Sequence, residues 1–379
     1  MTEFTNRTTS PFRYDIVGSF LRPAELKAAR EKFAQGKISQ AELTAVEDQA
    51  IIKLIKEEEA AGLKAVTDGE FRRSWWHLDF FWGFQGVEKA TLAHGYHFAD
   101  EETRPETVKI TGPLTGDHHP FVEHFKFVRD YVSKGTQVKQ TIPAPAQFLE
   151  EFLRPENQAN VKQFYVNLAD FDSAVVKAYR QVIQDLYDAG CRTLQLDDCT
   201  WGISVNAFAN LKKKDPKADV SELQALQERF LKVNNATLAN WPADLTINTH
   251  VCRGNYHSTW AAAGGYGPVA DTLLAQENVT AFYLEYDSKR AGGFEPLTKV
   301  PNDKYVVLGL VTSKTGKLED KETIINRIHE AAKFHPLDKL CLSPQCGFAS
   351  TEEGNILTSD QQWAKLKLIQ EIAQEVWGK

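Results

Sequence analysis

The chain has 379 residues, of which 42% are hydrophobic, 11% aromatic and 25% charged. This composition is typical of a folded globular protein and excludes the disordered and fibrous classes. A formal net charge of −7 argues against nucleic-acid binding, and the sequence contains neither a membrane-length apolar run nor a signal-peptide core. Five cysteines are too few for a secreted disulfide framework. We therefore expect a cytoplasmic protein that binds neither nucleic acid nor membrane.

The first strong helix signal covers residues 39–61. It opens with a predicted capping box of Ser39 and Glu42, carries apolar residues at helical spacing and ends at Gly62. A short β-rich run, 64–70, follows directly and ends in acidic residues. A helix followed by a buried strand is the unit that the rest of the chain repeats.

Helices and strands alternate from this point to the C-terminus. Helical patterns occupy 169–189, 222–238, 269–276, 320–334 and 360–377, the last with a predicted capping box of Ser359 and Gln362. The eight candidate strands are 64–70, 108–113, 137–142, 193–198, 245–252, 281–286, 305–311 and 339–344.

Alternating strands and helices imply a parallel sheet, and eight such units predict an α/β fold of the (β/α)8 TIM barrel type. An open doubly wound sheet is the alternative, but no G-x-G-x-x-G motif follows the first strand. No linker of Gly/Ser or Pro composition divides the chain. We predict a single domain over 1–379, with 1–62 as an N-terminal helical extension packed on the barrel.

Candidate chemical groups gather at the predicted carboxyl ends of the strands. The fifth strand ends in His250 and Cys252, the sixth ends at Glu285, and Cys346 follows the eighth. In a barrel these ends share one rim, and strand residues separated by one position point to the same side. One nitrogen, two sulfurs and a carboxylate oxygen suit tetrahedral zinc and disfavour magnesium or calcium. The spacing therefore indicates a Zn²⁺ site formed by these four residues.

The other three cysteines have a simpler interpretation. Cys191 follows the helix-ending Gly190, and Cys341 lies within an apolar strand, so we expect both to be packed in the core. Cys199 follows the acidic pair at the end of the fourth strand, nearer the predicted rim. Packing is the favoured interpretation for Cys199 as well, with a chemical role as the alternative.

Several segments together resemble one family. The runs TINTHVCRGN, FYLEYD and LSPQCGF resemble the zinc-binding segments in the C-terminal catalytic barrel of the cobalamin-independent methionine synthases. The runs IVGSFLRP, TDGE and LQLDD resemble the segments of that family that contact homocysteine. These motifs follow the family's order and cover nearly the whole chain. The family's large N-terminal half has no counterpart here, so the chain resembles the shorter, barrel-only relatives.

The resemblance implies the same four zinc ligands and three substrate contacts. Ser19 and its neighbouring backbone would hold the amino-acid carboxylate, and Glu70 with Asp197 would hold the ammonium group. Carboxylates are suited to that role because an ammonium group leaving water needs negative charge to offset its desolvation. The structural alternatives are an ion pair of Glu70 with Arg72 or Arg73, a helix-capping contact of Asp197, and a turn hydroxyl for Ser19.

The activity that the resemblance implies is zinc-dependent transfer of a methyl group to the thiol of homocysteine, which gives methionine. A free thiol is mostly protonated at neutral pH, and the thiolate is the nucleophile. A zinc ion lowers the pKa of a bound thiol in the way that it lowers the pKa of bound water, and it also orients the sulfur.

The methyl donor stays open. The folate-dependent enzymes of the family carry a histidine just after the seventh strand, where this chain has Thr312 and Ser313. They also carry a glutamate beyond the acidic pair, where this chain has Trp201 and Ile203. The candidate replacement acid is His257, near the metal segment. Methylcobalamin, a methylsulfonium compound and another methylated metabolite are the alternatives to a methyl-folate.

Two other classes of zinc protein, a hydrolase and a non-catalytic binding protein, are alternatives to a methyltransferase. A zinc hydrolase would normally use histidine and carboxylate ligands in place of two thiolates, and a closed zinc site would give a barrel that binds an amino acid without catalysis. The aromatic run 71–84 follows the first strand and could cover a flat donor. Core packing is the alternative for that run.

Overall fold

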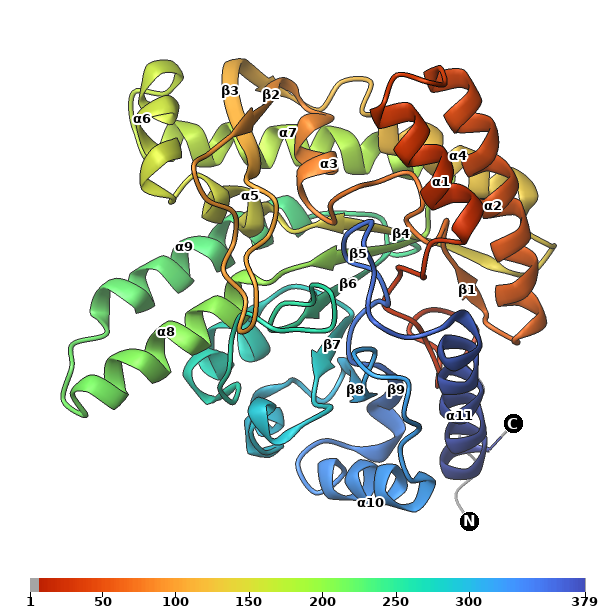
Figure 1. Ribbon diagram of the computed structural model, residues 1–379. Coiled ribbons are helices and arrows are strands. Elements are labelled where there is room, and N and C mark those ends of the chain that lie inside the picture. The colour runs from red at the N-terminus through yellow and green to blue at the C-terminus, as the bar shows by residue number, and fades with distance from the viewer. Residues whose placement is uncertain (1–6, 379) are drawn as a thin grey trace.

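A computed structural model describes residues 7–378. Seven parallel strands form one curved sheet in the order β1-β4-β5-β6-β7-β8-β9 (Figure 1). Their bounds are β1 Ala65–Val66, β4 Gln137–Pro143, β5 Thr193–Asp197, β6 Thr246–Val251, β7 Ala281–Glu285, β8 Tyr305–Val311 and β9 Leu340–Pro344. The central strands are buried on both faces, as expected for parallel strands covered by helices.

An N-terminal segment closes the gap between the two edge strands of this sheet. Tyr14 forms a parallel bridge with Leu342 of β9. At the other edge, the Thr67 hydroxyl donates to the Gly18 carbonyl at 2.6 Å, and the Phe20 N–H donates to the Gly69 carbonyl at 3.1 Å. The predicted α/β barrel architecture is confirmed, and segment 13–20 stands where the eighth strand would lie.

The prediction that 108–113 is a barrel strand was wrong. That segment belongs to β3 (Glu106–Thr115), which pairs antiparallel with β2 (Gln85–Thr91) in a separate hairpin. Val108 and Ile110 are buried whereas Lys109 between them is exposed. This alternation is typical of an antiparallel ribbon with one covered face, and the preceding β2 is close enough in sequence to pair first.

The helices lie around the sheet, and most predicted ones occur within two residues of their expected bounds. Their bounds are α1 Ala24–Ala34, α2 Gln40–Ala60, α3 Leu78–Trp82, α4 Pro120–Tyr131, α5 Pro145–Glu151, α6 Pro155–Phe164, α7 Leu168–Asp188, α8 Thr200–Lys214, α9 Ser221–Leu238, α10 Lys321–Ala331 and α11 Ser359–Trp377. The capping box of Ser39 and Glu42 on α2 is confirmed.

Three helix predictions differ in detail. Helix α10 ends at Ala331, three residues before the predicted end at 334. The capping box of α11 consists of Thr358 and Gln361, one residue earlier than expected, because Thr358 has the extended backbone that an N-cap requires. The predicted helix 269–276 is a 3₁₀ turn, Gly267–Val269, followed by a π-helix, Ala270–Leu274.

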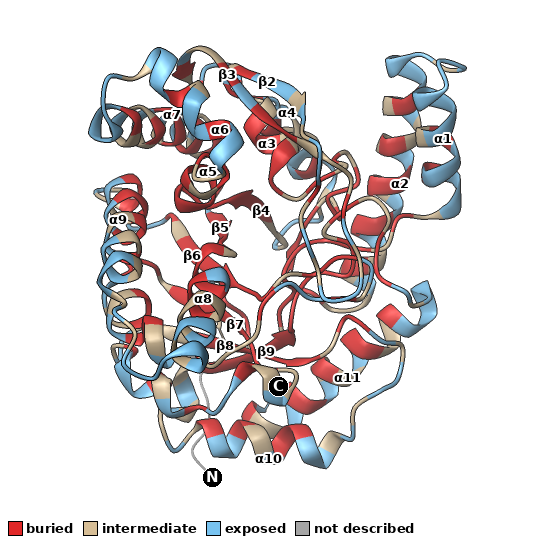
Figure 2. Cartoon of the chain, turned by 60° about the vertical axis from the view of Figure 1, so that its left-hand side comes forward, coloured by how far each residue is buried: buried red, intermediate tan, exposed pale blue. Residues whose placement is uncertain are grey.

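Burial follows the expected layers. The sheet and the inner helix faces are buried, and the outer helix faces are exposed (Figure 2). Helices α1 and α2 form an antiparallel pair at one side of the sheet (Figure 1). Residues 1–6 of the predicted extension lie outside the described residues, and the single-domain assignment stays a prediction. No helix within 7–378 is long and apolar enough to cross a membrane.

Candidate active site

The register of the sheet aligns the predicted site residues at one end. Asp197, the last residue of β5, lies opposite His250 of β6, and His250 lies opposite Tyr283 of β7. The Asp198 N–H also donates to the His250 carbonyl at 2.8 Å. Parallel strands that end level with one another deliver their following residues to the same rim. The acidic pair and the histidine-cysteine pair therefore meet there.

Three of the four predicted zinc ligands converge. One ligand atom each of His250, Cys252 and Cys346 lies within 4.8 Å of the other two, and all three residues are buried. The His250 Nδ1 lies 3.2 Å from the Tyr283 carbonyl oxygen, whereas Nε2 is buried and has no hydrogen-bond partner among the described residues. A histidine held through one nitrogen with the other nitrogen free is the usual arrangement of a metal ligand. The three residues fit a soft divalent metal such as zinc.

The two thiols are held in their protonated form by their surroundings in this arrangement. A hydrogen bond with Cys199, together with burial, raises the pKa of Cys252 well above its usual value. A hydrogen bond with Cys346 acts in the opposite direction but is outweighed. Hydrogen bonding to Cys252, together with burial, raises the pKa of Cys346. A bound dication would offset these effects, because a coordinating thiol loses its proton.

Glu285, the fourth predicted ligand, lies outside that group of three. Its Oε2 accepts a hydrogen bond from the Arg253 N–H at 2.8 Å, and its Oε1 forms an ion pair with Arg290 Nη2 at 2.6 Å. Glu285 and the side chain of Arg253 are buried. The carboxylate is thus at the end of β7, as expected, but both oxygens face arginine groups.

The predicted ammonium-binding acids are buried beside a shared arginine. Glu70 accepts a hydrogen bond from the Thr141 hydroxyl at 2.6 Å and forms an ion pair with Arg73. Burial outweighs the Arg73 charge and raises the pKa of Glu70 to about 7. Burial likewise raises the pKa of Asp197 to about 6. Arg73 lowers the pKa of both acids, and Lys139, which is itself paired with Asp15, also lowers the pKa of Asp197, but burial outweighs these charges.

Local backbone geometry explains how Glu70 reaches this position. Asp68 Oδ1 accepts the Glu70 N–H at 2.7 Å, and Gly69 and Glu70 both have positive φ, +63° and +60°. Glycine adopts this conformation without a steric cost. A Cβ on Gly18 would lie 2.6 Å from Glu70 Oε1, so the neighbouring segment can approach the carboxylate only with glycine there.

Ser19 lies next to the cysteine segment. Its hydroxyl oxygen accepts a hydrogen bond from the Ala349 N–H at 3.1 Å, and its carbonyl accepts one from the Phe348 N–H at 2.9 Å. A Cβ on Gly347 would lie 1.9 Å from Ser19 Oγ. The glycine after Cys346 therefore allows the serine and the metal-binding loop to be adjacent.

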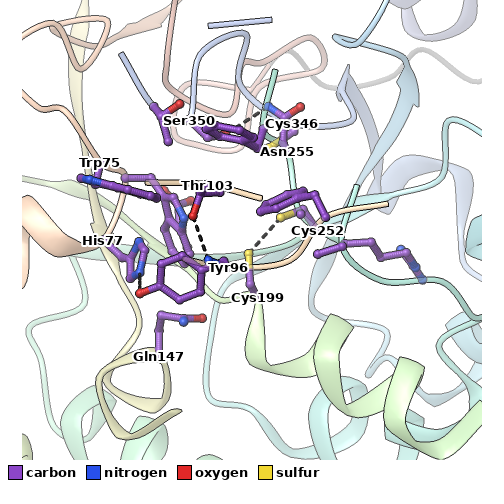
Figure 3. A pocket seen from close by; sticks show the side chains of 18 of the residues that line it. Trp75, His77, Tyr96, Thr103, Gln147, Cys199, Cys252, Asn255, Cys346 and Ser350 are labelled. Carbon is purple, nitrogen blue, oxygen red and sulfur yellow. Dashed lines mark hydrogen bonds between the residues drawn. The ribbon is translucent and has the colours of Figure 1, made fainter. Parts of the chain in front are cut away.

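These groups line one cavity of about 450 Å³ (Figure 3). Ser19, Glu70, Asp197, His250, Cys252 and Cys346 are on one part of its wall. The rest of the wall is mixed, and it includes aromatic residues from two segments. These residues are Trp75, Trp76, His77, Tyr96, His97 and Phe98. The cavity thus joins a polar pocket to an aromatic one.

The loop of the β2–β3 hairpin forms part of the cavity wall. The Ala99 N–H donates to the Trp260 carbonyl at 2.8 Å, and the Phe98 and Tyr256 ring centroids are 5.4 Å apart. Figure 1 shows this loop reaching from the hairpin across the sheet. The segment that was predicted as a barrel strand therefore serves instead to support a cover over the site.

The aromatic run 71–84 contributes to the core and to the cavity wall. Phe80, Phe81 and Phe84 are buried in the core, as the packing interpretation expects. Trp75, which is also buried, and Trp76 line the cavity, and their role as a cover over a donor stays a prediction.

The residues that the sequence placed near the methyl donor do not form one group in the structure. His257 is 46% exposed at its side chain, and its Nδ1 lies 3.3 Å from Glu101 Oε1. Its role as an acid stays a prediction. Ser313 is buried and donates to the Gly347 carbonyl at 2.9 Å. Trp201 is buried in the core, and Ile203 lines the cavity.

Comparison with known proteins identifies the family of the chain. Residues 13–375 match the family described as cobalamin-independent synthase, catalytic domain. The chain belongs to the cobalamin-independent methionine synthase family. Membership supports methyl transfer to homocysteine at the level of the family.

Individual relatives match over most of the chain. The uncharacterized proteins YxjH and YxjG of Bacillus subtilis are 44% and 43% identical, over 97% and 98% of this chain and 95% and 96% of theirs. A methionine synthase of Saccharolobus solfataricus is 24% identical over 88% of this chain and 86% of its own length.

Two solved structures share the fold. One, from Listeria monocytogenes, carries the description "putative vitamin-B12 independent methionine synthase". It has a TM-score of 0.75 and 38% identity over 97% of this chain and 99% of its own. The other, a B12-independent methionine synthase from Shewanella in complex with selenomethionine, has a TM-score of 0.68 and 18% identity over 96% and 97%. The latter likeness supports the fold alone.

The sequence motifs did not identify the residues of the cavity wall that lie outside them. Tyr96 and His97 belong to the hairpin loop, which carries no recognisable motif. Cys199 lies closer to the cysteine cluster than expected. Its position in the sequence could have indicated this contact. Asp197 pairs with His250, and Cys199 and Cys252 each follow their paired residue by two positions.

Proposed function

We propose that this protein is a zinc-dependent methyltransferase that converts homocysteine to methionine. The observation that supports the proposal most strongly is the convergence of His250, Cys252 and Cys346, with a free His250 Nε2, on the wall of the cavity that also holds the acids. Glu285 is proposed as the fourth ligand, which requires its carboxylate to turn from Arg290.

The amino-acid end of the substrate would bind beside Glu70 and Asp197. Both acids are buried, so an ammonium group that enters would form charge-assisted hydrogen bonds where water is excluded. Arg73 fixes the orientation of Glu70 by its ion pair. Ser19 and the adjacent backbone would receive the carboxylate, as the family resemblance implies.

The thiol end would then point to the histidine-cysteine group. When bound there, zinc supplies the charge that keeps a substrate thiol as its thiolate at neutral pH. The protein orients the His250 ring through the Tyr283 carbonyl, and the buried surroundings of Cys252 and Cys346 limit competing access of water. These contacts would hold the substrate sulfur toward the rest of the cavity.

The methyl donor would occupy the aromatic part of the cavity. Trp75, Trp76 and Tyr96 offer flat surfaces there, and the aromatic groups would bind an apolar or planar donor by stacking. The donor itself is not specified by this chemistry, and methyl-folates, methylcobalamin and methylsulfonium compounds are all to be compared.

The test combines zinc content with a donor screen. The purified protein is expected to carry one zinc per chain and to transfer a labelled methyl group to homocysteine from one of these donors. A zinc hydrolase would instead cleave the donor without labelling homocysteine. A barrel that only binds an amino acid would retain zinc and homocysteine with no turnover of any donor.

A matched pair of variants separates the site from general stability. Cys346→Ser is expected to lose both zinc and methyl transfer, because it removes one of the converging ligands. Cys341→Ser, a buried cysteine of β9 away from the group, is the control and is expected to keep both. Retention of full zinc content and turnover by Cys346→Ser would refute the proposal.

A further inference from the structure

Cys199 has no part in the proposed methyl transfer, yet its sulfur touches the metal-binding group. The Cys199 Sγ lies 3.1 Å from the Cys252 Sγ (Figure 3). Both residues line the cavity, but Cys199 is partly exposed whereas Cys252 is only 5% exposed. The pair therefore joins a sulfur that solutes in the cavity can reach to a sulfur that is buried.

The fold explains why these sulfurs meet. Asp197 of β5 pairs with His250 of β6, and each cysteine follows its paired residue by two positions. Cys199 is the N-cap residue of α8. A Cβ on Gly202, in the first turn of α8, would lie 2.2 Å from the Cys252 carbonyl oxygen. Glycine at that position lets the helix start come close enough for the sulfurs to be in contact.

We propose that Cys199 and Cys252 form an oxidation site that a hydroperoxide converts to a disulfide. The sulfur atoms need to approach by only about 1 Å to reach the disulfide bond length. The three remaining cysteines are placed differently. Cys191 and Cys341 are buried in the core, and Cys346 shares the metal-binding group with Cys252 at a separation of up to 4.8 Å.

The chemistry balances with hydrogen peroxide as the oxidant. The Cys199 sulfur attacks a peroxide oxygen, the O–O bond breaks, and the products are a sulfenic acid and one water. The Cys252 sulfur then attacks the Cys199 sulfur, the S–O bond breaks, and a second water leaves. Two thiols lose two protons and two electrons in total, and the peroxide takes them up to become two waters.

The consequence for the metal rests on the proposed function. A thiolate is a metal ligand, and a disulfide sulfur carries no such charge. Formation of the bond would therefore remove Cys252 from the group with His250 and Cys346 and release zinc. A dithiol reductant would restore both thiols and allow zinc to rebind.

The experiment treats the reduced, zinc-loaded protein with equimolar hydrogen peroxide. We expect the number of titratable thiols in the unfolded protein to fall from five to three. Digestion without reductant should yield one linked pair of peptides, which contain Cys199 and Cys252. A chromogenic chelator should detect zinc release over the same time, and dithiothreitol should reverse all three changes.

Two variants complete the design. Cys199→Ala is expected to form no link and to retain its zinc under the same exposure, whereas the core control Cys191→Ala should behave as the natural protein does. A link between Cys252 and Cys346, a sulfonic acid at Cys199 without a link, or equal zinc loss from Cys199→Ala would overturn the proposal. If Cys199→Ala does not fold, the peptide map of the natural protein decides alone.

Mapping of the linked peptides does not depend on activity. A protein that forms the link but never contains zinc would uphold the oxidation site and refute the proposed function. A zinc-containing, active protein that forms no link would do the opposite.

Discussion

At the scale of single residues, burial decides the chemistry of the candidate site. Glu70 is 5% exposed, and its pKa is raised to about 7 by burial although Arg73 lies beside it. A carboxylate in such surroundings gains most from a second cation, because desolvation has already removed its water. This is the property that an ammonium-binding residue requires.

Replacement of Glu70 by Gln tests this role. The variant keeps an acceptor for the Thr141 hydroxyl but loses the charge, so we expect homocysteine to bind more weakly by about 1.5–3 kcal/mol. The loss should appear in KM more than in kcat, with zinc content unchanged. The control is 4-mercaptobutanoic acid, which is homocysteine without its amino group, and its binding should be insensitive to the change. An equal loss with both thiols would contradict the assignment.

At the scale of elements, buried polar contacts connect the helices behind the strand ends. The Asn234 side chain on α9 donates to Asp198 at 2.9 Å and to Glu277 at 2.7 Å, and accepts the Ala146 N–H of α5 at 2.9 Å. Burial raises the pKa of Glu277 to about 8. Asn234 thus connects α5, α9 and the segment before β7, and the Glu277 carboxyl group that it contacts remains protonated near neutral pH.

The sign of the pH effect follows from this raised pKa. Between the ordinary glutamate value and about 8, the unfolded chain loses the Glu277 proton while the folded chain keeps it. Stability from this group is therefore complete at low pH and is lost as pH rises toward 8. Glu277→Gln imitates the protonated form and should not lose it.

We expect the stability of Glu277→Gln relative to the natural protein to improve by about 1 kcal/mol or more between pH 5 and pH 8. Urea unfolding at several pH values measures this difference. Glu228→Gln, an exposed position on α9, is the matched control and should show no such trend. A difference for Glu277→Gln that is independent of pH would exclude a raised pKa.

At the scale of the whole molecule, the N-terminal segment is tied into the centre of the barrel. Asp15 and Lys139 of β4 form a buried ion pair at 3.2 Å, and the Tyr283 hydroxyl of β7 donates to Asp15 at 2.7 Å. The side chains of both charged residues are at most 1% exposed. One contact set therefore connects the closing segment to strands on opposite parts of the sheet.

Lys139→Met removes one charge and keeps the side-chain length. We expect a loss of about 3–5 kcal/mol in the free energy of unfolding, because Asp15 is left buried without its cation. Addition of Asp15→Asn should recover part of that loss, and both proteins should unfold in one urea transition. Lys134→Met, at an exposed position in the loop before β4, is the control. Full stability of Lys139→Met would show that the pair does not support closure.

Sequence patterns were enough to predict the alternation of helices and parallel strands, the position of the site at the strand ends, and the family. These features depend on local periodicity and on motifs, and both can be read without contacts. His250 and Cys252 were recognisable for this reason, because residues two apart on a strand share a side.

Contacts between segments that are distant in the sequence could be seen only in the folded chain. Segment 13–20, and not the expected strand 108–113, closes the barrel. The sulfurs of Cys199 and Cys252 are in contact, and Glu285 forms an ion pair with Arg290. Each outcome depends on contacts between residues far apart in sequence, where pairing, close approach at a glycine and competition between charges are settled by packing. Local sequence patterns cannot predict the outcome of this competition, because it depends on residues outside the local segment.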